Sequence, residues 1–336
     1  MSRRIAVLGA GSWGTALADV LARNGHEVRL WAWSEELADD LRRTRRNERY
    51  LPGVDLDSRL DVSHELDAVL GRADAILSVS PSHYVRSVMS AAAPHIAREA
   101  LLISASKGLE LESNRRMSEV LYDVLPAKLA NGVVVLSGPS FAAELARGLP
   151  TAVTLASSNT DNAMAVQEMF QSDRFRLYTQ SDVIGTEVGG ALKNVMAIAA
   201  GISDGLGLGN NARAALLTRG LAEMGRLAET MGGQAVTLAG LAGMGDLVLT
   251  CTGDLSRNRR VGLALGSGRN LANVLDEMDA VAEGVRTTRA ARELATAHGV
   301  EMPIVEAVYS VLYESVDPME GLARLMAREP KPERWS

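Results

Sequence analysis

The chain has 336 residues, 47% of them hydrophobic, which is enough for about two domains with a sizeable core. Its formal net charge of −6 gives no general electrostatic reason to bind nucleic acid or an anionic membrane. Cys251 is the single cysteine, so an intramolecular disulfide is excluded and we expect a cytoplasmic protein.

The first pattern along the chain is typical of a dinucleotide-binding loop. Residues 5–8 are short, apolar and partly β-branched, as a buried strand should be, and residues 16–22 have the apolar spacing of a helix. Between them stands Gly9-Ala-Gly-Ser-Trp-Gly14. Here Gly9 permits a tight turn, Gly11 lets the backbone approach a pyrophosphate, and Gly14 lets the helix pack closely on the strand. A second strand, expected at residues 27–31, supplies the context that makes this motif specific.

No feature of the sequence favours a membrane protein. An apolar stretch follows Arg3 and Arg4 as in a secretory signal, but Asp19 interrupts it and the glycines suit such a signal poorly. We find no apolar run long enough to span a bilayer, and we therefore expect a soluble chain without membrane insertion.

Short strands alternate with helices over the first half of the chain. A polar, arginine-rich stretch at residues 39–49 and a loop at residues 50–53 follow the second strand, and helices are expected at 84–92 and 161–170. Further strands are expected at residues 75–79, 101–104, 132–136, 151–155 and 174–178. This alternation predicts a Rossmann-like, doubly wound α/β sheet that is largely parallel.

The pattern changes near Gly185, after which no convincing strand alternation remains. Helices broken by glycine-rich turns are expected at residues 188–201, 212–231, 260–265, 273–277, 287–298, 303–314 and 318–326. We therefore predict a dinucleotide-binding Rossmann domain at residues 1–185 and an all-α substrate-binding and catalytic domain at residues 186–336. We expect the active site in the cleft between these domains.

Lys193 is the strongest candidate for a catalytic group. On a helix its neighbours three and four residues away include Gly189, Gly190 and Ala197, so its face is small and apolar. Those small residues would allow close approach of a ligand or another helix, and Asn194 adds a second polar group. Desolvation would lower the pKa of the lysine toward the range where it exchanges protons with a carbinol. The alternative is a surface lysine whose ammonium group reaches water.

Two further candidates follow predicted strands, where open α/β sheets bind ligands. Lys107 directly follows one strand, and Ser137-Gly-Pro-Ser140 closes the next. Ser140 is the better candidate of the two serines, since we expect it to cap a helix that runs to residue 147. The alternatives are a charged loop tip for Lys107 and an ordinary proline turn for the serines.

Asp246 stands among glycines and apolar residues, where a carboxylate is costly unless it is paired. We expect a lysine or a substrate hydroxyl as its partner, and the alternative is a helix N-cap. Shortly after it, Ser256-Arg-Asn-Arg-Arg260 combines capping residues with positive charge. In an acidic chain this short cluster suits one phosphate dianion, although such runs are usually solvated helix starts.

Other kinds of chemistry lack support. No HExxH, paired CxxC or carboxylate–histidine cluster occurs, so we predict no metal site. The five histidines are scattered, which makes a lysine-driven hydride transfer more attractive than a histidine-driven one. Cys251 is expected to be a small buried or loop cysteine rather than a nucleophile.

Taken together, these segments resemble the bacterial NAD(P)-dependent glycerol-3-phosphate dehydrogenase family. The matching motifs span nearly the whole chain in the correct order: Gly9-Ala-Gly-Ser-Trp-Gly14, Ser106-Lys-Gly-Leu-Glu110, Leu136-Ser-Gly-Pro-Ser-Phe-Ala142, Glu187-Val-Gly-Gly-Ala-Leu-Lys-Asn194, Gly205-Leu-Gly-Leu-Gly-Asn-Asn-Ala212, Gly243-Met-Gly-Asp246, Ser256-Arg-Asn-Arg259 and Val281-Ala-Glu-Gly284. The resemblance implies reversible hydride transfer between sn-glycerol 3-phosphate and dihydroxyacetone phosphate, which supplies glycerol 3-phosphate for phospholipid synthesis. It also implies a homodimer.

The resemblance assigns roles to residues of this chain. It makes Lys193 the proton acceptor and donor, with the like charge of Lys107 helping to keep it neutral. The expected substrate-binding residues are Lys107, Gly138, Ser140, Asn194, Asp246, Ser256, Arg257 and Asn258, with Arg257 and Asn258 on the phosphate. Besides the loop glycines, the expected cofactor contacts are Ser12, Trp13, Lys107, Ala142, Arg257, Val281 and Glu283.

The chain departs from the family after the second strand, near the adenosine ribose. The family often has arginine or histidine there, whereas this chain has Trp33 and Ser34, and no aspartate closes the strand to favour NAD. We expect Trp33 to stack on adenine and Ser34 to bond a 2′-phosphate, with help from the arginines between Arg42 and Arg49. This predicts NADP as the preferred cofactor, with NAD accepted.

Two other interpretations stay open on the sequence alone. A dehydrogenase of the 3-hydroxyacid or 6-phosphogluconate type would share the two-domain plan and a catalytic lysine, but would act on a carboxylated substrate. A cofactor-sensing module would bind the nucleotide without hydride transfer, and it would leave Lys193, Asn194 and Asp246 unexplained.

Overall fold

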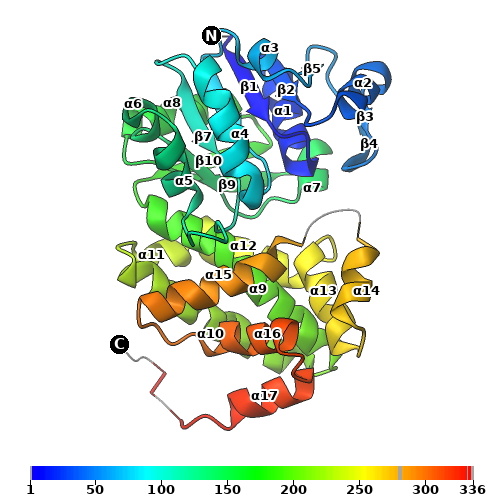
Figure 1. The fold of residues 1–336 in the computed structure, drawn as a ribbon, viewed down its shortest axis with the longest axis vertical. Coiled ribbons are helices and arrows are strands. Elements are labelled where there is room, and N and C mark those ends of the chain that lie inside the picture. The colour runs from blue at the N-terminus through cyan, green and yellow to red at the C-terminus, as the bar shows by residue number, and fades with distance from the viewer. Residues whose placement is uncertain (1, 279–281, 331, 334–336) are drawn as a thin grey trace. The chain divides into compact units, whose positions relative to one another are not determined.

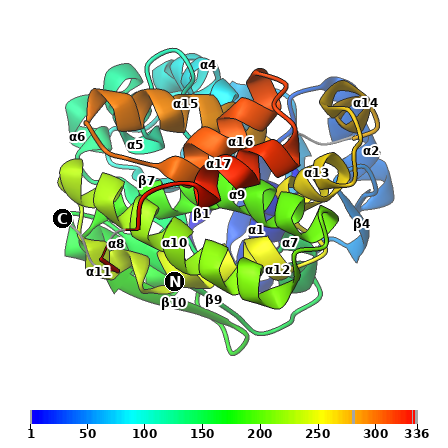
Figure 2. The ribbon, with the colours of Figure 1, turned by 90° about the horizontal axis from the view of Figure 1, so that it is seen from below.

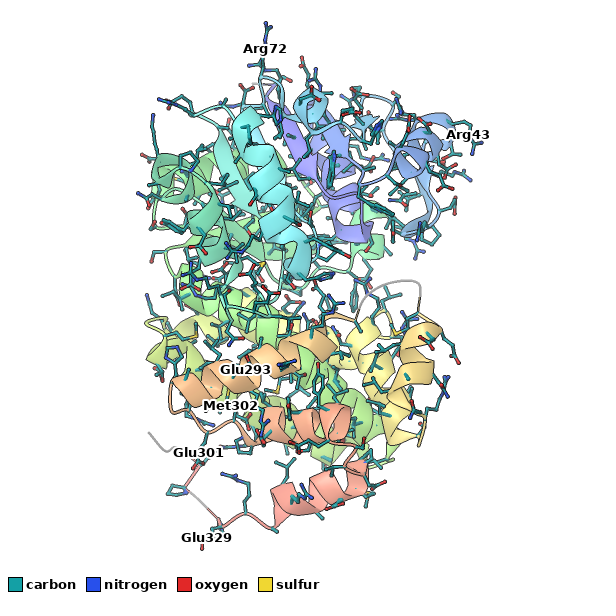
Figure 3. All side chains as sticks on the ribbon, viewed as in Figure 1. Arg43, Arg72, Glu293, Glu301, Met302 and Glu329 are labelled. Atoms are coloured by element: carbon teal, nitrogen blue, oxygen red, sulfur yellow. The ribbon has the colours of Figure 1, made fainter. Side chains whose placement is uncertain are left out.

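The computed structural model describes residues 2–278, 282–330, 332 and 333. The chain divides into two compact units, one formed by residues 1–107 and 116–183 and the other by residues 108–115 and 184–336. The short segment 108–115 belongs to the second unit, because Leu109 is buried in its core and Asn114 donates a hydrogen bond of 3.1 Å to Glu293, which is labelled in Figure 3.

The first unit is a sheet with helices on both faces (Figure 1). Its strands are β1 (Arg4–Leu8), β2 (Glu27–Trp31), β3 (Arg46–Asn47), β4 (Leu51–Asp55), β5 (Asp61–Ser63), β6 (Ala75–Ser78), β7 (Leu101–Ser104), β8 (Val134–Ser137), β9 (Thr151–Ala156) and β10 (Phe175–Gln180). Its helices are α1 (Ser12–Arg23), α2 (Glu35–Thr44), α3 (Leu66–Leu70), α4 (Val85–Ala92), α5 (Met117–Val124), α6 (Ala127–Ala130), α7 (Ala142–Ala146) and α8 (Thr160–Phe170), with short 3₁₀ turns at Ser82–Tyr84 and Ala93–His95.

The main sheet has the order β10-β9-β8-β7-β6-β1-β2-β5. Its neighbouring strands are parallel except β8 and β9, which pair antiparallel, so the predicted doubly wound and largely parallel sheet is confirmed. The two faces follow from the period of two residues along a strand. In β1, Ile5 and Val7 enter one hydrophobic core, and Ala6 and Leu8 enter the core on the other face.

Outside segment 108–115, the regular elements of the second unit are all helical in the part of it that the structure describes. Its helices are α9 (Val183–Gly205), α10 (Gly209–Thr230), α11 (Ala235–Leu238), the π-helical turn η3 (Leu241–Gly245), α12 (Asp246–Thr252), α13 (Arg257–Gly266), α14 (Leu271–Asp276), α15 (Glu283–Ala297), α16 (Pro303–Tyr313) and α17 (Pro318–Met326). Figure 2 shows α9 running among the other helices of this unit, and residues 185–203 of α9 are all buried. A helix that is apolar on every side is stable only when it is covered in this way.

We expected no apolar run long enough to cross a bilayer, and this expectation is wrong, because one helix has the required length and composition. Within the described residues, α9 has a mean hydropathy of 1.2 over an 18-residue window, which is long and apolar enough. However, 89% of that window is buried inside the structure, as in the core helix of a soluble protein.

Two local predictions in the first unit are wrong. The expected loop at 50–53 lies mostly in β4, which pairs antiparallel with β3. Ser140 does not cap a helix: α7 begins after Phe141 without a side-chain cap, and the Ser140 hydroxyl instead donates to the Gly138 carbonyl at 3.0 Å. The hairpin is fixed by a long-range contact that local patterns do not reveal, because the buried Asn47 amide donates to the Ala10 carbonyl at 3.0 Å and to Thr15 Oγ1 at 2.7 Å.

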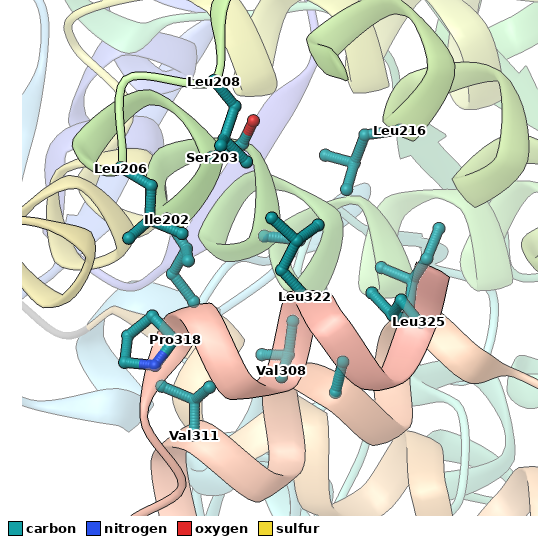
Figure 4. A pocket seen from close by; sticks show the side chains of 14 residues that line it. Ile202, Ser203, Leu206, Leu208, Leu216, Val308, Val311, Pro318, Leu322 and Leu325 are labelled. Atoms are coloured by element: carbon teal, nitrogen blue, oxygen red, sulfur yellow. The ribbon is translucent and has the colours of Figure 1, made fainter. Parts of the chain in front are cut away.

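An apolar pocket of about 60 Å³ lies within the second unit, among α9, α10, α16 and α17 (Figure 4). Its lining includes Ile202, Leu216, Val308 and Leu325 and no titratable side chain, so we place no chemistry there.

Candidate functional site

The glycine-rich loop has the geometry that the sequence predicts. Gly9 has a φ of +134°, which only glycine adopts readily, and a Cβ on Gly14 would lie 1.9 Å from the Gly9 carbonyl oxygen. A Cβ on Gly11 would meet nothing within 4 Å, so this position stays open to an approaching group. Helix α1 begins here without a side-chain cap and without an acidic residue in its first turn. The unpaired N–H groups and the helix dipole therefore suit a pyrophosphate.

Trp13 adds a second observation at this loop. Its indole Nε1 is buried and has no hydrogen-bond partner within the described part of the chain. A buried donor without a partner is costly, and an acceptor on a bound ligand would satisfy it. Ser12 precedes it as the first residue of α1. The loop thus fits the dinucleotide that the sequence predicts.

The region after β2 contains one side chain that could stack on adenine and two carboxylates that disfavour a 2′-phosphate. Trp33 is 64% exposed, which leaves its face available for stacking. The Ser34 hydroxyl accepts from the Leu37 N–H at 3.3 Å and caps α2, whose first turn carries Glu35 and Glu36. Those carboxylates would repel a 2′-phosphate near this helix end.

Most arginines of this region already have partners. Arg42 pairs with Asp39 at 2.5 Å, Arg43 with Asp40 at 2.6 Å, and Arg46 with Asp55 at 2.6 Å, while Arg45 donates to the backbone carbonyls of Asp57 and Leu60. Arg49 lies 5.3 Å from the centre of the Tyr50 ring and has neither a carboxylate nor a carbonyl partner in the described structure. The preference for NADP over NAD stays a prediction.

A second group of predicted residues meets at the Gly138 carbonyl, also in the first unit. Lys107 Nζ donates to this oxygen at 3.0 Å, and so does the Ser140 hydroxyl. Gly138 has a φ of +135°, and a Cβ there would lie 3.0 Å from Val153 Cα, so the turn requires glycine. Ala142 begins α7 directly after this turn and is partly exposed. The structure therefore brings Lys107, Gly138 and Ser140 together at the carboxyl ends of β7 and β8.

The second unit holds a buried ion pair. Lys193 Nζ donates to Asp246 Oδ1 at 2.5 Å, and the side chains of the two residues are 9% and 1% exposed. Helix α9 packs closely against η3 at Gly189, one turn before the lysine. A Cβ there would lie 2.5 Å from the Ala242 carbonyl oxygen, so the close approach requires glycine. The surface alternative for Lys193 is therefore excluded, and Asp246 has the lysine partner that we expected rather than acting as an N-cap.

A chain of hydrogen bonds lies beside this pair. Asn258 Nδ2 donates to Asn194 Oδ1 at 2.9 Å, and the Gly284 N–H donates to Asn258 Oδ1 at 2.9 Å. Both asparagine side chains are buried. The bonds join α9, α13 and α15. Asn194, Asn258 and Gly284 directly follow the predicted site residues Lys193, Arg257 and Glu283, respectively.

The first turn of α13 carries the Ser256-Arg-Asn-Arg cluster, and its role in phosphate binding stays a prediction. The Ser256 hydroxyl caps the helix by accepting from the Arg259 N–H at 3.2 Å. Arg257 is exposed at this turn. Crowding by the surrounding protein lowers the pKa of its guanidinium group, and the charge of the nearby Glu283 carboxylate acts in the opposite direction. Val281, an expected cofactor contact, lies outside the described residues.

Two members of the site were missed by the sequence prediction. Thr250 Oγ1 donates to the Asp246 carbonyl at 2.6 Å and lies 3.4 Å from Asp246 Oδ1, and its spacing of four residues on a helix was a usable signal. Gly284 belongs to a motif that matches the family, but no role was predicted for it. A Cβ there would lie 2.6 Å from the Asn194 carbonyl oxygen, so this contact requires glycine.

Neither a reactive thiol nor a metal-binding cluster is found among the described residues. Burial raises the pKa of Cys251 to about 12, so its thiol is inert at neutral pH. Among the residues that the structure describes, no three histidine, cysteine, aspartate or glutamate side chains are grouped as a metal site would require.

Comparison with known proteins gives a consistent assignment. The family models described as the NAD-dependent glycerol-3-phosphate dehydrogenase N-terminus and C-terminus match residues 4–163 and 182–323. The chain is 54% identical to a glycerol-3-phosphate dehydrogenase [NAD(P)+] of Citrifermentans bemidjiense over 99% of both chains, and 54% identical to that of Geobacter sulfurreducens over 100% of both. The crystal structure of glycerol-3-phosphate dehydrogenase from Coxiella burnetii superposes with a TM-score of 0.92 at 44% identity, covering 97% of this chain and 99% of that one. The chain therefore belongs to the NAD-dependent glycerol-3-phosphate dehydrogenase family.

Proposed function

We propose that the chain is an NAD(P)-dependent oxidoreductase that interconverts sn-glycerol 3-phosphate and dihydroxyacetone phosphate. One observation carries the proposal: the buried Lys193–Asp246 pair lies next to the Asn194–Asn258 hydrogen bond, in a chain whose relatives are named for this reaction. A buried lysine paired in this way is suited to exchange a proton with a substrate oxygen.

Lys193 serves as the general acid in the reductive direction. Its ammonium group gives a proton to the carbonyl oxygen of dihydroxyacetone phosphate, and the nicotinamide cofactor, when bound, supplies the hydride to the carbon of that carbonyl. Asp246 stabilises the charged form of the lysine, and Thr250 holds the aspartate in place. In the oxidative direction the neutral amine takes the hydroxyl proton.

The substrate phosphate binds at the first turn of α13 in this proposal. Arg257 is the cation for the dianion, and Ser256 and Asn258 flank it. We assign Gly138, Ser140 and Lys107 to the glycerol moiety. The loop at residues 9–14, with Trp33, Ala142 and Glu283, holds the cofactor, so residues 1–185 supply most of the dinucleotide site and residues 186–336 supply the catalytic groups.

Assembly and cellular role complete the proposal. We infer a homodimer and a cytoplasmic location, with the product serving as the glycerol backbone of phospholipids. Light scattering coupled to size-exclusion chromatography measures the mass in solution, and a monomer would contradict the dimer.

The experiment that tests the activity compares substrate classes. The absorbance of reduced nicotinamide is followed with dihydroxyacetone phosphate and with a 2-keto acid, using NADPH and NADH in turn. Oxidation with the phosphorylated ketone supports the proposal, whereas oxidation with the keto acid alone supports a dehydrogenase of carboxylated substrates. Cofactor binding without oxidation of either kind would favour a non-catalytic sensor.

A further inference from the structure

The second arginine of the Ser256-Arg-Asn-Arg259 motif has no role in the proposal above. Arg259 Nε donates to Asp204 Oδ2 at 2.9 Å, and its Nη1 donates to Asp254 Oδ1 at 2.9 Å. Its side chain is 14% exposed. Because two carboxylates already take its charge, Arg259 is poorly placed to bind a phosphate.

Asp204 joins three helices through this contact. It stands near the end of α9, its side chain is 8% exposed, and its Oδ1 also accepts from Arg213 Nε of α10 at 2.8 Å. One buried carboxylate thus serves two arginines from different helices. We call Asp204, Arg213 and Arg259 the Asp204 clamp.

Two of the three helices that the clamp joins, α9 and α13, are in backbone contact. A Cβ on Gly201 of α9 would lie 2.1 Å from the Arg259 carbonyl oxygen, and a Cβ on Gly262 of α13 would lie 2.0 Å from the Ile198 carbonyl oxygen. Gly205 and Gly266 continue the contact one turn further, with corresponding distances of 2.5 Å to the Leu263 carbonyl oxygen and 2.4 Å to that of Ile202. Without side chains between the helices, the place of α13 along α9 depends on the polar groups at the edge of the contact.

We propose that the Asp204 clamp is a positioning device for the phosphate-binding turn. Arg259 lies one residue after Asn258 and two residues after Arg257. Fixing the position of Arg259 therefore also fixes the turn that carries Asn258 and Arg257. The Asn258–Asn194 bond holds this turn from a second side. The inference rests on the proposed function, because it takes Arg257 as the cation that binds the substrate phosphate.

Loss of the Asp204 charge should shift this turn rather than merely weaken the fold. Arg213 and Arg259 would then face each other as like charges, and Asp254, which is 97% exposed, would offer Arg259 only a solvated partner. A misplacement of Arg257 by about 1 Å is enough to cost up to a hundredfold in rate.

The test compares a substrate that has a phosphate with one that lacks it. For Asp204→Asn we expect the kcat/KM for dihydroxyacetone phosphate to fall by about tenfold or more, mainly through KM. At saturating cofactor, turnover of dihydroxyacetone should stay within about twofold of wild type, because this ketone has no phosphate for the turn to bind. Asp254→Asn is the matched control, since it removes the exposed partner of the same arginine, and it should behave as wild type.

An equal loss with both substrates would overturn the inference, since that is what a general structural role produces, and so would an unchanged Asp204→Asn enzyme. If Asp204→Asn does not fold, Arg259→Lys carries the same comparison, because lysine keeps the charge but not the forked geometry. Failure of the proposed function is distinct, since wild-type protein would then oxidise neither cofactor with dihydroxyacetone phosphate.

Discussion

Lys193 shows how a charge is tolerated inside an apolar helix. Its ammonium group is buried against Asp246, and each charge offsets the desolvation of the other. The sequence predicted the small face around this lysine and a lysine partner for Asp246. It could not predict the distance, which depends on the approach of η3 to α9 at Gly189.

The first prediction concerns this lysine. Lys193→Ala should lower kcat by about a hundredfold or more, because it removes the general acid, while cofactor affinity changes little. Stopped-flow turnover and tryptophan fluorescence titration with NADH measure the two quantities. Lys128→Ala, which removes an exposed partner of Glu99, is the control and should retain full activity. Normal turnover of Lys193→Ala would remove the lysine from the mechanism.

At the scale of elements, Glu223 of α10 holds the start of α16. Its Oε1 accepts from the Ile304 N–H at 2.9 Å, and its side chain is buried. Burial raises the pKa of Glu223 to about 7, against the opposing effects of the backbone N–H groups of Ile304 and Val305 and the charges of Arg226 and Arg219. No local pattern in the sequence indicates this cap, because donor and acceptor lie in helices far apart along the chain.

A pH dependence follows from that raised pKa. The folded state binds the proton more tightly than the unfolded state, whose glutamate titrates near 4.5, so the stabilising effect is complete below pH 4.5 and is lost as the pH rises through about 7. Relative to Glu223→Gln, which does not titrate, the wild type should lose about 3 kcal/mol of unfolding free energy over this range. Urea denaturation at a series of pH values measures the difference, and parallel curves for the two proteins would contradict it.

The contact between α9 and α13 leads to a prediction about packing. Gly262→Ala should lower the free energy of unfolding by about 1–3 kcal/mol or more, because its Cβ would lie 2.0 Å from a backbone oxygen. Gly225→Ala in α10 is the matched control, since its Cβ would meet nothing closer than Ala235 Cβ at 3.9 Å. We expect that control to be neutral or to gain up to about 1 kcal/mol. Equal stability of the two variants would show that the helices can separate without cost.

At the scale of the whole molecule, strong local periodicity predicted the fold well. Strands β2 and β7 have the expected bounds, and α9, α16 and α17 lie where apolar spacing placed them. Elements fixed by long-range contacts were harder to predict. The β3–β4 hairpin depends on Asn47 bonding the glycine-rich loop, and segment 108–115 joins the second unit through Leu109 and Asn114.

In the candidate site, too, some features were predictable from local patterns and others depend on long-range contacts. Their positions after strands singled out Lys107 and Ser140, and their small or apolar neighbours singled out Lys193 and Asp246. The tasks of the two arginines at 257 and 259 could not be separated, since the pattern contains neither Asp204 nor the glycine contact that sets their surroundings. The role of each site residue stays a prediction until activity is measured.

The most direct test of the central claim follows the hydride itself. Wild-type protein is incubated with dihydroxyacetone phosphate and cofactor carrying deuterium at the transferable position, and the product is analysed by mass spectrometry and NMR. The account predicts sn-glycerol 3-phosphate with one deuterium on its central carbon, formed in step with cofactor oxidation and lost in Lys193→Ala. Cofactor oxidation without deuterium in glycerol 3-phosphate, or no reaction with this ketone, would contradict it.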